Sequence, residues 1–204
     1  MTIGPGTEWS RPGRLAPGAP IVASDRELSD LAQQVRITNG SLPTVGLVGG
    51  TLWKTVGGAS VKGRLHTAEA RHYDVDLVRV ELDTVPFWFV GSLVARTPLW
   101  GHVLAVMNTP WLGPLRLGHR SHPGDAMVDI TEGSNLTFDD LRKIIPRARH
   151  GAHIPHPKLK ETRVREPTSW TFDRPHRVSV DGRTLGRFST VSISVEADAL
   201  VVVV

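Results

Sequence analysis

Apolar residues near the start of the chain recur at helical spacing, at Leu28, Leu31, Ala32 and Val35. Ser24, followed three residues later by Glu27, has the form of a capping box at the start of this helix. Asn39-Gly40 is expected to end it. Short apolar runs at 21–23 and 44–48 flank the helix, so the sequence predicts a β-α-β unit here.

The pattern changes after Gly57 to alternation at a period of two residues. Val75–Leu82 alternates in this way, as does much of Pro86–Val94, and Asp83-Thr84 between them predicts a hairpin turn. Further short strand candidates, each bounded by turn residues, lie at 102–107, 127–130, 163–165, 169–172, 177–180, 190–195 and 200–204. Strands of this length and spacing are typical of an antiparallel β domain.

One helix is expected to interrupt these strands. Thr137 has the character of a helix cap, and apolar residues follow on one face, at Phe138, Leu141, Ile144, Ile145 and Ala148. Pro146 should kink or shorten this helix, and Gly151 should terminate it.

These elements predict an α+β fold, in which an antiparallel β-sandwich domain with one helix follows a reduced β-α-β lobe. Residues 1–19 are rich in Gly and Pro with little to bury, and we expect a flexible or contact-ordered arm. The lobe would span residues 20–58 and the β-sandwich residues 59–204.

Composition narrows the function classes. The 204 residues are 40% apolar and include no cysteine, which excludes disulfides and thiolate chemistry. No apolar stretch approaches the length of a membrane span and the start lacks a signal core, so we expect a cytoplasmic protein. The net charge of +4 favours anionic partners only mildly, and because the basic residues are scattered we do not expect nucleic-acid binding.

The segment Gly101–Ile130 has the organisation of a site: an apolar run opens into a polar, glycine-dotted loop that returns past one acid into a second strand. It resembles the diacylglycerol kinase-like lipid kinases, which are related to sphingosine kinases and more distantly to NAD kinases. The matching residues are Asn108, Gly113, Gly118, Asp125 and Asp129. Six weak motifs in the family's order extend the resemblance over about residues 20–204, as a reduced and degenerate member.

The resemblance implies where a nucleotide would bind. The family's Gly-Gly-Asp-Gly-Thr loop corresponds to 23–27 and its Gly-Thr-x-Asn-Asp loop to 50–57, which leaves Asp25 and Thr51 as the nucleotide-binding candidates. Arg26 and Glu27 place side chains where glycines would let main-chain N–H groups approach phosphates. The alternative interpretation is structural, with Ser24 and Asp25 capping a helix and Gly49-Gly50 turning the chain.

The resemblance also implies the remaining catalytic groups. The family's base, the Glu of Asp-Gly-Glu, is replaced here by Arg183, whose guanidinium cannot accept a proton. The alternative for Asp181-Gly182, just before it, is a two-residue hairpin turn with no catalytic role. Asp125, helped by the main-chain carbonyls of His122 and Met127, corresponds to the family's Mg²⁺ site. The alternative is that Asp125 caps the turn before Met127.

Two other groups of residues invite a functional interpretation. His150, His153 and His156 recur every third residue, but Pro155 and Pro157 favour an extended segment that would point the rings apart, so zinc is not expected. Four tryptophans are expected to pack in the core or at its edge: Trp53, Trp88, Trp100 and Trp111.

The leading hypothesis is a diacylglycerol kinase-like protein without kinase activity that acts as a binding or scaffold protein, with a homodimer as its candidate assembly. The first alternative is an active ATP-dependent lipid kinase that phosphorylates a lipid hydroxyl, with ATP and Mg²⁺ as cofactors. The second alternative is a peripheral module that binds anionic lipid through its basic loops. A lipid or a nucleotide is the expected ligand in all three cases.

Overall fold

The computed structural model describes residues 9–58 and 64–204. In chain order the elements are β1 (Ser10–Pro12), β2 (Ile21–Val22), α1 (Asp25–Ile37), β3 (Val45–Leu47), α2 (Gly50–Thr55), η1 (Arg64–His66), β4 (Arg71–Leu82), β5 (Val85–Phe89), β6 (Ser92–Arg96), η2 (Pro98–Trp100), β7 (His102–Met107), β8 (Val128–Ser134), α3 (Phe138–Ala148), β9 (Leu159–Val164), β10 (Thr168–Val180) and β11 (Arg183–Val203). No helix within the described ranges is long and apolar enough to cross a bilayer.

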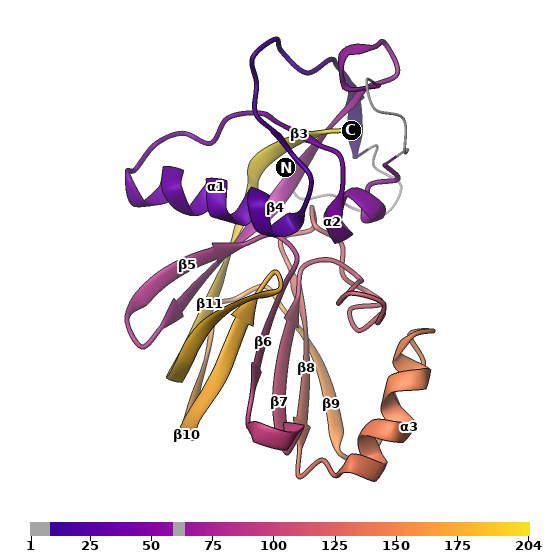
Figure 1. Cartoon of the computed structure of the whole chain (residues 1–204), viewed down its shortest axis with the longest axis vertical. Helices are drawn as coiled ribbons and strands as arrows, with labels where there is room; N and C mark the ends of the chain where they lie inside the picture. The colour runs from indigo at the N-terminus through magenta and orange to yellow at the C-terminus, as the bar shows by residue number, and fades with distance from the viewer. Residues whose placement is uncertain (1–8, 59–63) are drawn as a thin grey trace.

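The strands form one open sheet in the order β1-β4-β11-β10-β6-β7-β8-β9, with β5 paired to β4. Most neighbours are antiparallel, and β3 pairs in parallel with both β2 and β11. The predicted α+β class with a mainly antiparallel sheet is therefore confirmed. The layers of the expected sandwich belong to a single hydrogen-bonded sheet, which curves so that residues of β4, β8 and β10 share one apolar core (Figure 1).

The long strands β4 and β11 connect two apolar cores. Val80, near the end of β4, and Val191, in the first half of β11, belong to the core of the β-rich half. Val75 and Val202, toward the other ends of these strands, pack under α1 and α2 in a second core. Figure 1 shows both strands running from one half of the molecule into the other. The halves are thus continuous through their central strands.

Several boundaries differ from the prediction. Within the expected N-terminal arm, β1 pairs with β4, and Leu15 is buried with its N–H donating to the Leu65 carbonyl; residues 1–8 lie outside the described residues. Gly50 begins α2 where a tight turn was expected. The separate strands expected at 169–172 and 177–180 are one strand, as are those at 190–195 and 200–204, since register shifts let each pair continue across its break.

The two predicted helices are present with their predicted caps. The Ser24 hydroxyl accepts a hydrogen bond from the Glu27 N–H, and the Glu27 carboxylate accepts one from the Ala23 N–H. Thr137 and Asp140 form a complete capping box at the start of α3. The helix extends only two residues beyond Pro146, and Gly151 follows at φ 70°, a conformation that glycine adopts readily.

The core of the β-rich half should depend on Leu104, which is fully buried in β7. We expect Leu104→Ala to lower the free energy of unfolding by about 2–5 kcal/mol, because the lost side chain leaves a cavity. Leu99→Ala, at an 89% exposed residue, is the matched control and should change stability little. Chemical denaturation measures both, and equal effects would contradict this assignment of the core.

Candidate functional site

The carboxylate of Asp25 caps the second helix. It accepts hydrogen bonds from the Thr51 N–H at 2.7 Å, the Thr51 hydroxyl at 2.7 Å and the Leu52 N–H at 3.0 Å. These main-chain donors are the first N–H groups of α2, which have no partner inside the helix. The two nucleotide-binding candidates, Asp25 and Thr51, are therefore hydrogen-bonded to each other.

A second buried carboxylate, Asp181, lies close to this cap. It accepts from the N–H groups of Val90, Gly91 and Ser92 at 2.7–3.1 Å and from the Ser29 hydroxyl at 2.5 Å. It thus connects α1, the β5–β6 bend and the β10–β11 turn. The predicted Asp181-Gly182 hairpin is confirmed, with φ of 44° and 79°. Asp181 is therefore more than a turn residue, because its carboxylate links three segments of the chain.

Burial raises the pKa of Asp181 to about 6, and the nearby charge of Asp25 adds to the rise, while the hydrogen bonds to Ser29 and the main chain oppose it. Gly91 lies between these groups: an added Cβ would stand 2.7 Å from the Asp181 carboxylate and 3.3 Å from the Thr51 hydroxyl. The space between the two acids is therefore filled by main chain.

Arg183, at the position of the family base, points to α1. Its guanidinium lies 2.7 Å from the Asp30 carboxylate, and its side chain is half exposed. A permanently protonated group in an ion pair cannot remove a proton from a hydroxyl. Between Val180 and Leu185 the structure offers no carboxylate other than Asp181, whose oxygens are already bonded.

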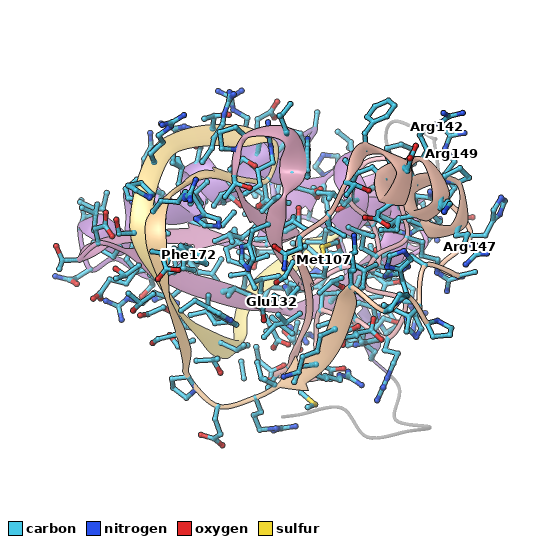
Figure 2. The ribbon with its side chains drawn as sticks, turned by 90° about the horizontal axis from the view of Figure 1, so that it is seen from below. Met107, Glu132, Arg142, Arg147, Arg149 and Phe172 are labelled. Atoms are coloured by element: carbon cyan, nitrogen blue, oxygen red, sulfur yellow. The ribbon has the colours of Figure 1, made fainter. Side chains whose placement is uncertain are left out.

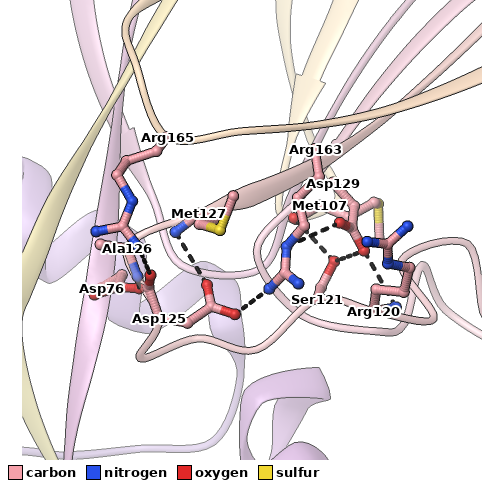
Figure 3. Close-up of polar contacts among 10 residues, drawn as sticks. All are labelled: Asp76, Met107, Arg120, Ser121, Asp125, Ala126, Met127, Asp129, Arg163 and Arg165. Atoms are coloured by element: carbon pink, nitrogen blue, oxygen red, sulfur yellow. Dashed lines mark hydrogen bonds and ion pairs between the residues drawn. The ribbon is translucent and has the colours of Figure 1, made fainter. Parts of the chain in front are cut away.

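The loop around Asp125 is held by arginines from β9 and beyond (Figure 3). One Asp125 carboxylate oxygen is paired with Arg163, and the other accepts from the Met127 N–H at 3.0 Å. Arg165 donates to the Asp125 main-chain carbonyl at 3.1 Å. Burial raises the pKa of Asp125, and the charge of Arg163 opposes that rise.

Asp129, the next acid along the chain, continues the same network. It is 1% exposed and accepts from the Ser121 hydroxyl and the Arg120 N–H, with the Arg163 Nε at 3.6 Å. Asp76 fixes the other side of the loop by accepting from the Ala126 N–H at 2.7 Å. Figure 3 shows these contacts side by side. The loop is thus shaped by acids that bind cationic side chains and main-chain N–H groups.

This arrangement does not fit the Mg²⁺ site that the resemblance implies. Both Asp125 oxygens are engaged, and the His122 carbonyl accepts from the Gly124 and Asp125 N–H groups of its own turn. No hydrogen bond or ion pair joins Asp125 to Asp25 or Thr51 in the part of the chain that the structure describes. The geometry favours the alternative interpretation, in which Asp125 caps the turn before Met127.

The histidines at 150, 153 and 156 do not converge. His156 faces Asp140 at 3.8 Å, while His153 is fully buried and His150 is exposed. No group of three or more metal-binding side chains assembles within residues 9–58 and 64–204. Trp53 and Trp88 pack against the second core as expected, whereas Trp100 is 38% exposed.

An apolar cavity of about 270 Å³ lies between α3 and the outer face of the sheet, and the sequence did not predict it. Alternate residues of β6 and β7 face the main core, and the others, Val94, Val103 and Ala105, form the cavity floor. Leu141, Ile144 and Ala148 of α3 and the leucines of the 112–117 loop complete the wall. The sequence feature that points to this cavity is the apolar run His102–Met107. Such a run requires both faces of β7 to be covered.

No protein-family model and no curated protein matches the chain. Solved structures do match it. Two are described as a "putative diacylglycerol kinase" from Bacillus anthracis; each is 10% identical, with TM-scores of 0.64 and 0.65 over 89% of this chain and 76% of the other. A third, described as a diacylglycerol kinase from the same organism, is 11% identical, with a TM-score of 0.51 over 78% of this chain and 66% of the other. The chain therefore has the fold of these diacylglycerol kinase-like structures, which confirms the resemblance at the level of the fold.

The buried carboxyl of Asp181 should make stability depend on pH. Its pKa is about 6 in the folded state against an ordinary 3.8, so its stabilisation is fully present below about pH 3.8 and is lost as pH rises through about 6. Asp181→Asn should destabilise the protein, since the amide has one acceptor oxygen and an NH₂ group that cannot accept where the second carboxylate oxygen does. The difference from the wild type, measured by urea unfolding, should shrink as pH rises from about 4 to 7, by up to about 3 kcal/mol. A difference that grows with pH would contradict the raised pKa; Asp173→Asn, at an exposed acid, controls for the lost charge.

Proposed function

We propose that this protein binds a single-chain lipid-like molecule in the cavity beneath α3 and does not transfer phosphate. The cavity carries the proposal. At about 270 Å³ it is larger than the roughly 150 Å³ engineered cavity that holds benzene. The matching structures are diacylglycerol kinases by description, which makes a lipid the ligand class to consider first.

The absence of kinase chemistry is supported by what the candidate residues already contact. Asp25 is occupied by the first turn of α2, Asp125 by Arg163, and Arg183 by Asp30. A nucleotide would have to displace internal hydrogen bonds at buried groups, which costs more than displacing water. The active-kinase alternative therefore has less support than a binding or scaffold role.

The cavity reaches the surface between η2 and α3. Trp100 and Ile145 both line it, and their side chains are 38% and 41% exposed. The other lining residues are buried or half-buried. An extended apolar chain could enter between these two residues and lie along the sheet, where its burial would supply the binding energy.

Filling the cavity should abolish binding. Ala105 lies on the cavity floor, so Ala105→Phe should weaken the binding of a fluorescent C12 fatty acid analogue by at least about tenfold, because the ring takes the ligand's space. Ala152→Phe, at an exposed position, is the control and should bind as the wild type does. Fluorescence titration measures the affinity, and thermal melting checks that both variants fold.

Two results would count against the proposal. One is equal lipid affinity in Ala105→Phe and the wild type. The other is tight, Mg²⁺-dependent ATP binding by calorimetry, together with transfer of radiolabelled phosphate to diacylglycerol that Asp125→Ala abolishes; that result would establish the kinase alternative instead.

A second candidate function, contact with an anionic membrane, is favoured by the outer face of α3. Four cations on and just after this helix make no ion pair within the described residues: Arg142, Lys143, Arg147 and Arg149. Figure 2 shows the three arginines projecting from α3, away from the sheet. Like charges left unpaired on one helix are complementary to an anionic lipid surface.

Exposed apolar side chains surround the same end of the molecule. Phe138 is 75% exposed at the start of α3, and Leu99 is 89% exposed beside Trp100. The Leu136 N–H donates to the Gly101 carbonyl, which ties the start of α3 to η2. Apolar residues flanked by cations are the composition of an interfacial membrane contact.

Neutralising the helix tests this contact. Each basic residue near an anionic surface contributes about 1 kcal/mol, so the triple change Arg142→Gln, Arg147→Gln and Arg149→Gln should weaken binding to phosphatidylglycerol vesicles about 100-fold. The control changes three exposed arginines of β1, the segment after it and α1, Arg11, Arg14 and Arg26, to Gln and should have a much smaller effect. The contact would be excluded if the fraction of protein that sediments with vesicles changed with neither salt concentration nor lipid charge.

A further inference from the structure

Three arginines lie directly opposite one another on neighbouring strands. Arg177 of β10 is the cross-strand partner of Arg96 on β6 and of Arg187 on β11. Figure 1 shows these strands side by side. The adjacent pair, Val178 and Ala95, belongs to the core of the β-rich half. Because successive side chains of a strand point to opposite faces, the three arginines share the outer face of the sheet.

The three side chains line one small cavity together with two prolines. The cavity has a volume of about 150 Å³, and Pro98 and Pro175 complete its wall. Pro175 lies at the register shift of β10, a place where a strand tolerates a residue that has no N–H to donate. The arginines therefore converge on a concave space whose other walls are rigid rings.

No acid balances these charges. The cavity lining contains no Asp or Glu. None of the three guanidiniums pairs with a carboxylate in the part of the chain that the structure describes. Arg96 lies over the Trp100 ring, with 4.3 Å between the guanidinium carbon and the ring centroid, and Arg177 donates to the Thr184 hydroxyl at 3.3 Å. Like charges directly opposite one another across a sheet are destabilising, so this row favours a bound anion.

The anion that best matches the row is a phosphate group. A guanidinium presents paired N–H donors that fit two oxygens of a phosphate. A phosphomonoester carries about 1.5 to 2 negative charges at pH 7 and three acceptor oxygens, whereas a carboxylate offers a single charge and two oxygens. A cavity of about this size can hold benzene, and a phosphate group is no larger than that ring.

We infer that Arg96, Arg177 and Arg187 form a binding site for the phosphate group of a small phosphomonoester. None of the lining residues is a candidate nucleotide or metal ligand, and the site does not depend on the proposed lipid binding. Two sources would present the same chemistry. One is a free phosphorylated molecule. The other is the headgroup of an amphiphile whose chain occupies the cavity beneath α3, since Trp100 lines that cavity and also contacts Arg96.

Inorganic phosphate is the probe for the first test. It should raise the melting temperature of the wild type, because a ligand that binds only the folded state stabilises it, and sodium acetate of the same ionic strength should not. Arg177→Gln and Arg187→Gln should each weaken phosphate binding about tenfold, as expected for one lost charge-assisted hydrogen bond. Titration of the arginine Nε–H signals by NMR measures the affinity.

Two further variants separate a shaped site from a general attraction between charges. Arg177→Lys keeps the charge but loses the planar fork, so it should recover only part of the lost affinity. Arg14→Gln, at an exposed arginine after β1, is the matched control and should bind phosphate as the wild type does. Without phosphate, Arg177→Gln and Arg187→Gln should not lower the melting temperature, because each removes a charge from a like-charged row.

Octyl phosphate distinguishes the two sources. If it binds more tightly than inorganic phosphate and Ala105→Phe removes the gain, the phosphate belongs to an amphiphile; equal affinities assign it to a free molecule, and either result supports the site. The inference is overturned if acetate stabilises the protein as phosphate does. It is also overturned if Arg177→Gln and Arg187→Gln bind phosphate as tightly as Arg14→Gln. Failure of the wild type to bind the fatty acid analogue would remove the proposed function and leave this site standing.

Discussion

Three aspartates stabilise this fold by accepting hydrogen bonds from main-chain N–H groups where regular structure breaks; Asp25 and Asp76 are buried and Asp181 is half-buried. Asp25 binds the first N–H groups of α2, Asp181 those of the β5–β6 bend, and Asp76 those of Ala126 and Asp198. Removing a carboxylate from water is costly, and several charge-assisted hydrogen bonds offset that cost. The consequence is that each of these acids joins segments that are distant in the sequence through hydrogen bonds to their main-chain N–H groups.

The same constraint explains how the long strands cross between the cores. β11 changes register between Glu196 and Leu200, where Asp198 adopts φ 51°. Asp76, on the neighbouring strand, accepts the Asp198 N–H at 3.0 Å and so stabilises the irregular residue. Burial raises the pKa of Asp76, while this bond and the one from Ala126 oppose the rise. One side chain thus fixes both a strand irregularity and the loop that carries Asp125.

Local signals predicted the local structure well. The caps at Ser24 and Thr137, the Asp83-Thr84 and Asp181-Gly182 turns, and the strand at 102–107 all follow from short-range chemistry, and all are present. Long-range pairing could not be predicted in the same way: the acceptor role of Asp181 depends on residues about 90 positions away, and the arginine that pairs with Asp125 lies 38 positions further on. Family resemblance located the candidate residues but not their partners, because partners are set by tertiary contacts.

The cavity could not be predicted from the sequence, for a related reason. An apolar run shows that both faces of a strand are covered, but not how completely. Here the cover is a short helix that ends just after Pro146 and contributes small Ala148 beside Ile144, which leaves space above Ala105. The helix is too short to fill the second face of the sheet. An apolar cavity therefore remains between them, and no special residue is needed to form it.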